Sequence, residues 1–219
     1  MPPLTTKRIL IVDDHPMIRE GLRTLISREP DLSVCGEAET AAEGLKATAE
    51  LNPDLVLVDI GLPGRNGLEL IKDLRAFHPA LPILVLSMHD ELLWAERVLR
   101  AGARGYVMKR ETGPVMVQAI RQVLANQLCV SEKISARILE SFAGHRVESS
   151  PLGLLSDREF EVFELIGRGK STTDIAAELH LSTKTVEAHR AKIKEKLELR
   201  TMPELISFAA RWVETQDTR

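Results

Sequence analysis

The chain has 219 residues, of which 44% are hydrophobic and 28% are charged, and its formal net charge is −3. This length and composition suit a soluble protein with one large or two small buried cores. No apolar stretch approaches the ~20 residues of a membrane span, and the first residues lack the apolar region of a signal peptide, so we expect a cytoplasmic protein without a membrane partner. Cys35 and Cys129 lie far apart and without metal-ligand spacing, which argues against a disulfide framework or a zinc site.

Up to about residue 126, short β-rich runs alternate with amphipathic segments. This alternation predicts five strands, at residues 8–12, 32–36, 55–58, 83–86 and 106–108. It also predicts five helices, at residues 17–27, 40–51, 68–77, 92–101 and 114–125. Right-handed crossovers place such helices on both faces of a sheet, so residues 1–126 are predicted to form an α/β doubly wound, five-stranded parallel sheet.

The pattern changes after Asn126, where no further strand is indicated. A helix is predicted over residues 131–142, and a segment rich in Ser, Pro and Gly follows it, so residues 127–151 are interpreted as a partly helical linker. Residues 152–219 are predicted to form a small all-α domain. Its helix starts are marked by a capping box at Ser156 and Glu159, by Thr172, by Ser182 as an N-cap, and by Pro203 early in the last helix.

Carboxylates follow two of the predicted central strands. Asp13 and Asp14 come directly after the first strand, and Asp59 comes directly after the third, before a loop rich in Gly and Pro. Because the carboxyl ends of central parallel strands lie side by side, we expect these three side chains to converge. A cluster of carboxylates repels itself unless a hard divalent cation neutralises it, and Mg²⁺ suits a site with few oxygen ligands. Mg²⁺ is therefore the implied cofactor.

Two further polar groups are predicted at the same edge of the sheet. Ser87 follows the fourth strand and Lys109 follows the fifth. A hydroxyl and an ammonium group stabilise the charge that develops on a phosphoryl group during transfer. The edge therefore combines groups that would bind a metal with groups that would bind a phosphoryl group.

These positions carry a resemblance to a known family. In the order and spacing of five positions, roughly residues 7 to 126 resemble the receiver domain of two-component response regulators: Asp13-Asp14, Asp59 with Pro63 and Gly67 behind it, Ser87, and Gly105-Tyr106-Val107-Met108-Lys109. The resemblance implies a flavodoxin-like fold. It also implies that a sensor histidine kinase or a small phosphodonor phosphorylates the domain.

The resemblance assigns the acidic residues their roles. Asp59 would be the phosphoacceptor, which attacks the donor and becomes an aspartyl phosphate. Asp14, Asp59 and the backbone carbonyl of Gly61 would ligate Mg²⁺, and Asp13 would act mostly through water. The protein would then phosphorylate and dephosphorylate itself without being a metabolic enzyme.

The resemblance also implies a switch. Lys109 would pair with the phosphoryl group, Ser87 would turn towards it, and Tyr106 would swing inward as the switch aromatic. These shifts would bias the face formed by the fourth predicted helix, the fifth strand and the fifth helix.

The helix after Ser182 has a narrow apolar stripe. At ~100° per residue, Val186, Ile193 and Leu197 share one face. The opposite face has small side chains in its middle and basic side chains at its flanks. Between residues 184 and 200, six basic residues against three acidic ones leave a local net charge of +3. These features favour a recognition helix in the major groove of DNA. The competing interpretation is a solvated, salt-bridged surface helix.

A second resemblance covers about residues 152 to 215. The segment is similar to the LuxR-type helix-turn-helix domain in Leu155-Ser156-Asp157-Arg158-Glu159, Leu165-Ile166, Gly169-Lys170-Ser171, Ile175-Ala176, Leu179, Leu181-Ser182, Thr185-Val186, His189, Ile193 and Lys196-Leu197. A receiver joined to this domain resembles the NarL/FixJ class of transcriptional regulators. The implied partners are double-stranded promoter DNA and a second copy of the chain, because a phosphorylated homodimer would read paired half-sites.

The second resemblance also implies the residues of a DNA interface. Those expected to face DNA are Lys184, Glu187, Ala188, Ala191 and Lys192, with Thr185 and Arg190 available to phosphates. Glu187 departs from the usual pattern, because the position is often basic, and it would read a cytosine amino group. The last helix, with Phe208 and Trp212, is a candidate part of the dimer surface.

Two other classes of function compete with a regulator. One is a metabolite phosphatase or phosphotransferase of the haloacid dehalogenase type, but those enzymes place Asp-x-Asp after a strand and Asp59-Ile60-Gly61 lacks the second acid. The other is a phosphate-independent binding module whose helical domain contacts protein. The complete acidic set with Lys109 argues against this second alternative.

Overall fold

The computed structural model describes residues 6–88, 91–136 and 151–217. The chain divides into two compact units, residues 1–138 and residues 139–219. Helical backbone is present at residues 132–136, and the rest of the helix predicted over residues 131–142 lies outside the described residues. None of the helices in the described part of the chain has the length and apolar character that a membrane span requires.

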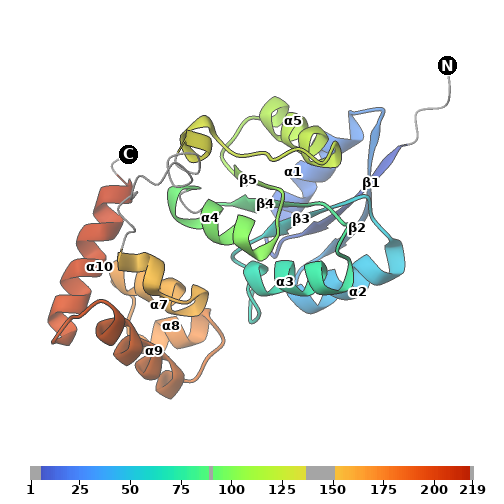
Figure 1. Cartoon of the computed structure of the whole chain (residues 1–219). Coiled ribbons are helices and arrows are strands. Elements are labelled where there is room, and N and C mark those ends of the chain that lie inside the picture. The colour runs from blue at the N-terminus through green and yellow to red at the C-terminus, as the bar shows by residue number, and fades with distance from the viewer. Residues whose placement is uncertain (1–5, 89–90, 137–150, 218–219) are drawn as a thin grey trace. The chain divides into compact units, whose positions relative to one another are not determined.

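The first unit is built on a five-stranded parallel sheet with the strand order β2-β1-β3-β4-β5 (Figure 1). Its elements in chain order are β1 (Lys7–Val12), α1 (Pro16–Ser27), β2 (Leu32–Ala38), α2 (Ala41–Leu51), β3 (Leu55–Asp59), α3 (Gly67–Phe77), β4 (Ile83–Ser87), α4 (Glu91–Ala101), β5 (Gly105–Met108) and α5 (Gly113–Leu124). Each predicted strand and helix is present, with ends shifted by one or two residues. The predicted α/β doubly wound fold is confirmed.

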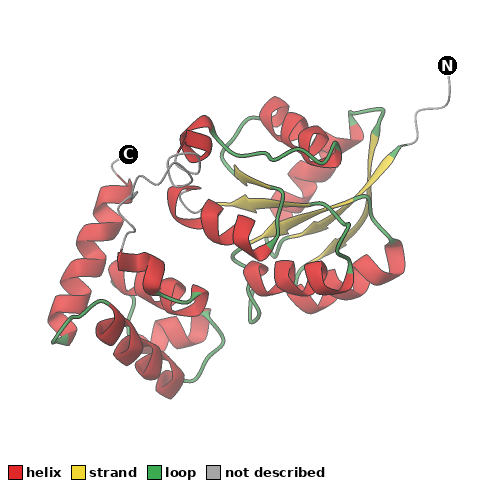
Figure 2. Ribbon diagram, in the orientation of Figure 1, coloured by secondary structure: helices red, strands yellow, loops and turns green. Residues whose placement is uncertain are grey.

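The helices cover both faces of this sheet. Helices α1 and α5 lie on one face, and α2, α3 and α4 lie on the other (Figures 1 and 2). The strand β3 is buried along its whole length, because it lies in the middle of the sheet and both of its faces are covered. This explains why its sequence is an unbroken apolar run rather than an alternating one.

The strand register brings the ends of four strands to one level. Val12 of β1 lies opposite Val58 of β3, so the residues that follow them, Asp13 and Asp59, are neighbours. Asp59 in turn lies opposite Leu86 of β4, and Ser87 lies opposite Met108 of β5. The parallel ladder therefore delivers Asp13, Asp59, Ser87 and Lys109 to the same edge of the sheet.

The chain after α5 returns alongside the edge strand β5. The backbone N–H of Cys129 donates to the carbonyl of Arg104, and the carbonyl of Cys129 accepts from the N–H of Tyr106 at 2.9 Å. These bonds satisfy backbone groups on the outer side of β5. They also tie the segment just beyond α5 to the backbone of Tyr106.

The second unit is all-helical within the described residues. Its elements are a 3₁₀ turn η1 (Pro151–Leu154), α7 (Asp157–Gly167), α8 (Thr172–Glu178), α9 (Thr183–Lys196) and α10 (Met202–Asp217). The predicted capping box is confirmed, because the Ser156 hydroxyl accepts from the N–H of Glu159 and the Glu159 carboxylate accepts from the N–H of Ser156. The predicted N-cap at Ser182 is confirmed as well, since its hydroxyl accepts from the N–H of Thr185.

An aromatic cluster joins α7 to α10. The ring centroids of Phe163 and Trp212 lie 5.4 Å apart, and those of Phe160 and Trp212 lie 5.5 Å apart. Phe208 packs on Phe163 at 5.8 Å. Phe208 and Trp212 therefore contribute to the core of their own unit, and each remains partly exposed.

We predict that Gly67→Ala destabilises the first unit by about 2 kcal/mol, because the alanine overpacks a tight backbone contact. A Cβ atom on Gly67 would lie 2.1 Å from the backbone oxygen of Asp59. Gly21→Ala in α1 is the matched control, since its Cβ would have no heavy atom within 4 Å among the described residues, and it should stabilise by about 1 kcal/mol. Urea denaturation measures both, and equal effects of the two substitutions would contradict the prediction.

Candidate functional site

The Asp59 carboxylate is buried at the end of β3 beside a buried ammonium group. Lys109 Nζ lies 2.8 Å from Asp59 Oδ2 and 2.7 Å from Asp13 Oδ2. All three side chains are at most 5% exposed. One cation therefore pairs with two buried anions, which leaves the cluster with an excess of negative charge.

The surroundings of this cluster shift the pKa of two of its groups. Burial raises the pKa of the Asp59 carboxyl, and the Asp13 carboxylate raises it further, against the opposing effects of Lys109 and of the N–H of Gly61. Burial alone would lower the pKa of the Lys109 ammonium, but the Asp59 carboxylate and the hydrogen bonds to Asp13 and Asp59 outweigh it, so that pKa is raised. Lys109 is therefore held in its charged form at neutral pH.

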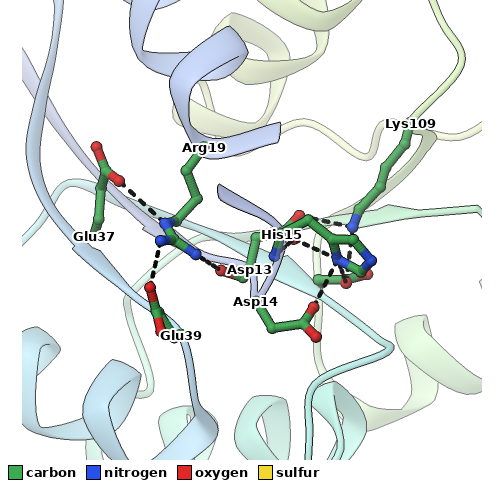
Figure 3. Close-up of polar contacts among 8 residues, drawn as sticks. Asp13, Asp14, His15, Arg19, Glu37, Glu39 and Lys109 are labelled. Atoms are coloured by element: carbon green, nitrogen blue, oxygen red, sulfur yellow. Dashed lines mark hydrogen bonds and ion pairs between the residues drawn. The ribbon is translucent and has the colours of Figure 1, made fainter. Parts of the chain in front are cut away.

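Asp14 and His15 complete the cluster on its solvent side. The Nδ1 atom of His15 lies 2.7 Å from Asp14 Oδ1, 3.2 Å from Asp13 Oδ1 and 3.9 Å from Asp59 Oδ2 (Figure 3). His15 is not among the site residues predicted from the sequence. It occupies the N-cap position of α1, but its imidazole faces the carboxylates instead of capping the helix.

The donor set fits a divalent cation. Asp13, Asp14, His15 and Asp59 each offer one ligand atom, and these atoms lie within 4.8 Å of one another. Three of the four donors are carboxylate oxygens, which are the ligands that Mg²⁺ prefers. A cation would also offset the excess negative charge that Lys109 alone leaves.

Of the remaining predicted receiver residues, Ser87 and Gly61 lie at the same edge, and Tyr106 lies within β5, opposite Val85. The carbonyl of Ser87 accepts a hydrogen bond from the N–H of Lys109 at 2.8 Å, which holds the ends of β4 and β5 together. Ser87 is fully buried, and the Tyr106 side chain is 2% exposed. Gly61 lies in the loop after β3, and its N–H donates to the Asp59 carboxylate. The structure brings six of the seven predicted receiver residues to one edge of the sheet, and the seventh, Tyr106, lies within β5.

Arg19 of α1 is a residue that the sequence analysis missed. Its guanidinium group reaches the backbone of Asp13 from the side opposite Lys109 and lies between Glu37 and Glu39 (Figure 3). The signal was present in the sequence, because position 19 lies on the same helical face as the buried Leu22 and Ile26. An arginine in an apolar stripe requires polar partners inside the fold.

The outer face of α9 carries most of the residues predicted to face DNA. The exposed side chains are those of Lys184, Glu187, Ala188, Ala191 and Lys192. Val186 and Ile193 on the opposite face are fully buried, as predicted. Thr185 is half-buried, and its hydroxyl lies 2.8 Å from that of the N-cap Ser182.

Arg190 and Lys196 are instead engaged within the second unit. Arg190 Nη1 donates to the hydroxyl of Thr172, and it lies 3.0 Å from Glu187 Oε1. Lys196 Nζ lies 2.6 Å from Glu159 Oε2 in the capping box of α7. These contacts attach α9 to α8 and α7, so the basic surface available on α9 is narrower than the sequence count suggests.

The Glu159 carboxylate is the buried partner in this attachment. Burial would raise its pKa, but the Lys196 ammonium and the hydrogen bonds from Ser156 outweigh burial and lower the pKa. Glu159 therefore stays ionised at neutral pH and serves two purposes. It caps α7 and it fixes the C-terminal turn of α9.

Both units match known families. The first unit has the sheet and the edge cluster of a receiver, and residues 9–121 match the family described as "Response regulator receiver domain". Residues 153–209 match the family described as "Bacterial regulatory proteins, luxR family". The chain therefore belongs to the NarL/FixJ class of response regulators, in which a receiver is joined to a LuxR-type helix-turn-helix domain. It is a phosphorylation-controlled regulator of transcription rather than a metabolic enzyme.

Full-length relatives share this arrangement. The response regulator GacA of Pseudomonas viridiflava is 38% identical over 205 residues, which cover 93% of this chain and 95% of that protein. RcsB from Salmonella enterica serovar Typhimurium, bound to promoter rprA in the presence of phosphomimetic BeF₃⁻, is 25% identical, with a TM-score of 0.64 and coverage of 94% and 98%. A structure of two RcsB dimers bound to two parallel DNAs is also 25% identical, with a TM-score of 0.57 and the same coverage.

We predict that Asp59→Asn stabilises the first unit by about 1 kcal/mol at neutral pH in the absence of divalent cations. The raised pKa means that the folded state holds the Asp59 proton more tightly than the unfolded chain does, so the ionised carboxylate destabilises the fold. This destabilisation is absent below the unfolded-state pKa and grows as the pH rises through the folded-state pKa. The advantage of the variant should therefore vanish in acid.

Urea denaturation in EDTA would measure this effect. Trp94 is buried in the first unit and Trp212 lies in the second, so fluorescence in a Trp212→Phe background reports on the first unit alone. Asp54→Asn is the control, because Asp54 lies at the opposite end of β3, where it pairs with Lys7. A loss of stability in Asp59→Asn at neutral pH would show that the Lys109 pair is net stabilising.

Proposed function

We propose that Asp59 is the phosphoacceptor through which a sensor histidine kinase controls promoter binding by this chain. The observation that carries the proposal is the position of the Asp59 carboxylate. It is buried at the strand end, 2.8 Å from the Lys109 ammonium and beside Asp13 and Asp14. This combines a nucleophile with the charge that a transferred phosphoryl group requires.

Each neighbouring residue has a separate task in this proposal. Asp59 attacks the phosphorus atom of a phosphohistidine or of a small phosphodonor, and the bond to the leaving group breaks as the aspartyl phosphate forms. Lys109 orients the carboxylate beforehand and pairs with the phosphoryl oxygens afterwards. Bound Mg²⁺, held by Asp14, Asp59 and the Gly61 carbonyl with Asp13 acting through water, would neutralise charge on those oxygens.

Ser87 and Tyr106 carry the signal away from the phosphorylated site. Ser87 would turn its hydroxyl towards the phosphoryl group, and Tyr106 would take the inward orientation in the space beside it. Support comes from their burial on the adjacent strands β4 and β5, where Ser87 lies opposite Met108 and Tyr106 lies opposite Val85. A closely packed interior transmits a shift of one side chain to its neighbours. These movements would change the surface formed by α4, β5 and α5, which would pass the signal on.

Replacement of Asp59 by Asn should abolish phosphorylation, because an amide cannot attack the donor. The measurement is incorporation of labelled phosphate from acetyl phosphate with MgCl₂, with loss of the label in hydroxylamine as the sign of an acyl phosphate. Asp54→Asn, at the other end of the same strand, should be labelled like the wild type. Undiminished labelling of Asp59→Asn would overturn the assignment.

We infer that α9 is the recognition helix and that the chain binds promoter DNA as a homodimer when phosphorylated. Support comes from the exposed Lys184 and Lys192 on its outer face, between which Ala188 and Ala191 allow close approach. Glu187 would contact a base edge and Thr185 would contact a phosphate at the border. Arg190 would contact a phosphate only after exchanging its bonds to Thr172 and Glu187 for it. The structures of RcsB bound to promoter DNA and of RcsB dimers bound to DNA support this assignment. A promoter-binding regulator of this kind would act in the cytoplasm.

Lys184→Ala and Lys192→Ala should each weaken DNA binding and lower the slope of log affinity against log salt by about 2, because each removes one phosphate contact per chain and therefore two per bound dimer. Fluorescence anisotropy with a short mixed-sequence duplex and the phosphorylated full chain measures both quantities. Lys46→Ala on α2 is the control that removes the same charge from the first unit. Unchanged salt slopes for both α9 variants would refute the interface.

A further inference from the structure

Arg19 of α1 is a buried cation with three acceptors, one at the end of β1 and two at the end of β2. Its side chain is 11% exposed. Nη1 donates to the backbone carbonyl of Asp13 at 2.7 Å, Nε to Glu37 Oε2 at 3.2 Å, and Nη2 to Glu39 Oε1 at 2.5 Å. A planar guanidinium group with several N–H donors can satisfy these three directions at once.

The bond to Asp13 is made where β1 ends and the chain leaves the sheet. The N–H of Asp13 donates to the carbonyl of Ala38, which is the last bond of the β1–β2 ladder. Beyond this bond the chain leaves the sheet, so the carbonyl of Asp13 needs another donor, and Arg19 supplies it. The side chain of Asp13 is held as well, by the N–H of His15 and by Lys109.

Arg19 therefore determines the orientation of one peptide group. The carbonyl of Asp13 belongs to the planar peptide group that links Asp13 to Asp14. When that plane is fixed, the direction in which the Asp14 side chain leaves the backbone is restricted too. Asp14 is the only one of the three carboxylates whose own side chain lacks a contact with Lys109 among the described residues.

We propose that Arg19 is a positioning residue for the divalent-cation site: through the Asp13 carbonyl it holds the Asp13–Asp14 peptide so that the Asp14 carboxylate faces the cluster. This inference rests on the proposed function, in which Asp14 and Asp59 bind Mg²⁺. Residues that orient metal ligands without touching the metal commonly change metal affinity by about 10- to 100-fold when replaced.

A purely structural role is the competing explanation. In that case Arg19 would only tie α1 to β2 through Glu37 and Glu39. Arg23 separates the two explanations, because it lies one turn further along α1 and its Nε is 3.9 Å from Glu37 Oε1. Its other ion pair, with Glu20, is exposed. Arg23 thus shares the helix, the charge and one partner with Arg19, but it has no bond to Asp13.

The test compares Arg19→Met with Arg23→Met in the full chain. MgCl₂ is titrated into each ¹⁵N-labelled protein, and the shifts of the amides of Asp14 and Gly61 give the dissociation constant. Phosphorylation by acetyl phosphate is then measured across Mg²⁺ concentrations, and thermal unfolding in EDTA is followed by circular dichroism. Loss of packing alone would lower the melting temperature without changing the Mg²⁺ constant.

Arg19→Met should raise the Mg²⁺ dissociation constant about tenfold or more, and Arg23→Met should change it less than about twofold. The half-saturating Mg²⁺ concentration for phosphorylation should rise by the same factor, while the rate at saturating Mg²⁺ falls much less. A wild-type Mg²⁺ constant in a folded Arg19→Met protein would overturn the inference and leave the proposed function intact. No Mg²⁺-dependent shift in the wild type would overturn the proposed metal site itself.

Arg19→Lys keeps the inference testable where the methionine variant fails to fold. The lysine retains the positive charge between Glu37 and Glu39, but a single ammonium group on a shorter reach cannot serve three acceptors in the same geometry. The Mg²⁺ dissociation constant of Arg19→Lys is expected to exceed that of the wild type. Where Arg19→Met folds, the constant of Arg19→Lys should lie between the other two. A wild-type constant in Arg19→Lys would show that charge alone suffices and would overturn the positioning role.

Discussion

The pairing of one buried ammonium group with two buried carboxylates is the interaction on which the receiver depends. Lys109 holds Asp13 and Asp59 at 2.7 and 2.8 Å inside a low-dielectric edge of the sheet. Removing a charge from water is costly, and this pairing offsets only part of that cost because the anions outnumber the cation. The residual negative charge makes the edge a place that favours a divalent cation. The same imbalance is consistent with the proposed role of Asp59 as the phosphoacceptor, and it underlies the predicted gain in stability when the Asp59 charge is removed.

The surrounding structure limits the freedom of this cluster. The strand register sets the level of the strand ends, the Ser87–Lys109 backbone bond joins β4 to β5, and Arg19 holds the Asp13 carbonyl. Each of these contacts acts on backbone rather than on the reacting carboxylate. A site built in this way keeps its geometry when the charge at Asp59 changes. In the proposed switch, the change would then be transmitted to side chains such as Ser87 and Tyr106 instead of being absorbed locally.

The second unit uses its charges differently. A net charge of −3 for the chain gives no indication of a polyanionic partner, so any attraction to DNA must come from the local positive charge on α9. Arg190 and Lys196, which look like part of the basic stripe in the sequence, hold α9 against α8 and α7. Lys184 and Lys192 stay exposed on the outer face. Some basic residues of α9 therefore attach the helix to the rest of the unit, and others form its exposed surface.

The sequence by itself determined the order of strands and helices, the helix caps, and the convergence of Asp13, Asp59, Ser87 and Lys109. It could do so because hydrophobic periodicity and strand ends are local properties of the chain. The contacts of Arg19, Arg190 and Lys196 were decided only by the tertiary structure. Each of these long or polar side chains can reach several partners, and the choice depends on residues distant in sequence, such as Glu37 for Arg19 and Glu159 for Lys196. A local pattern shows that a charge needs a partner, but only the packing of helices on the sheet or on one another selects it.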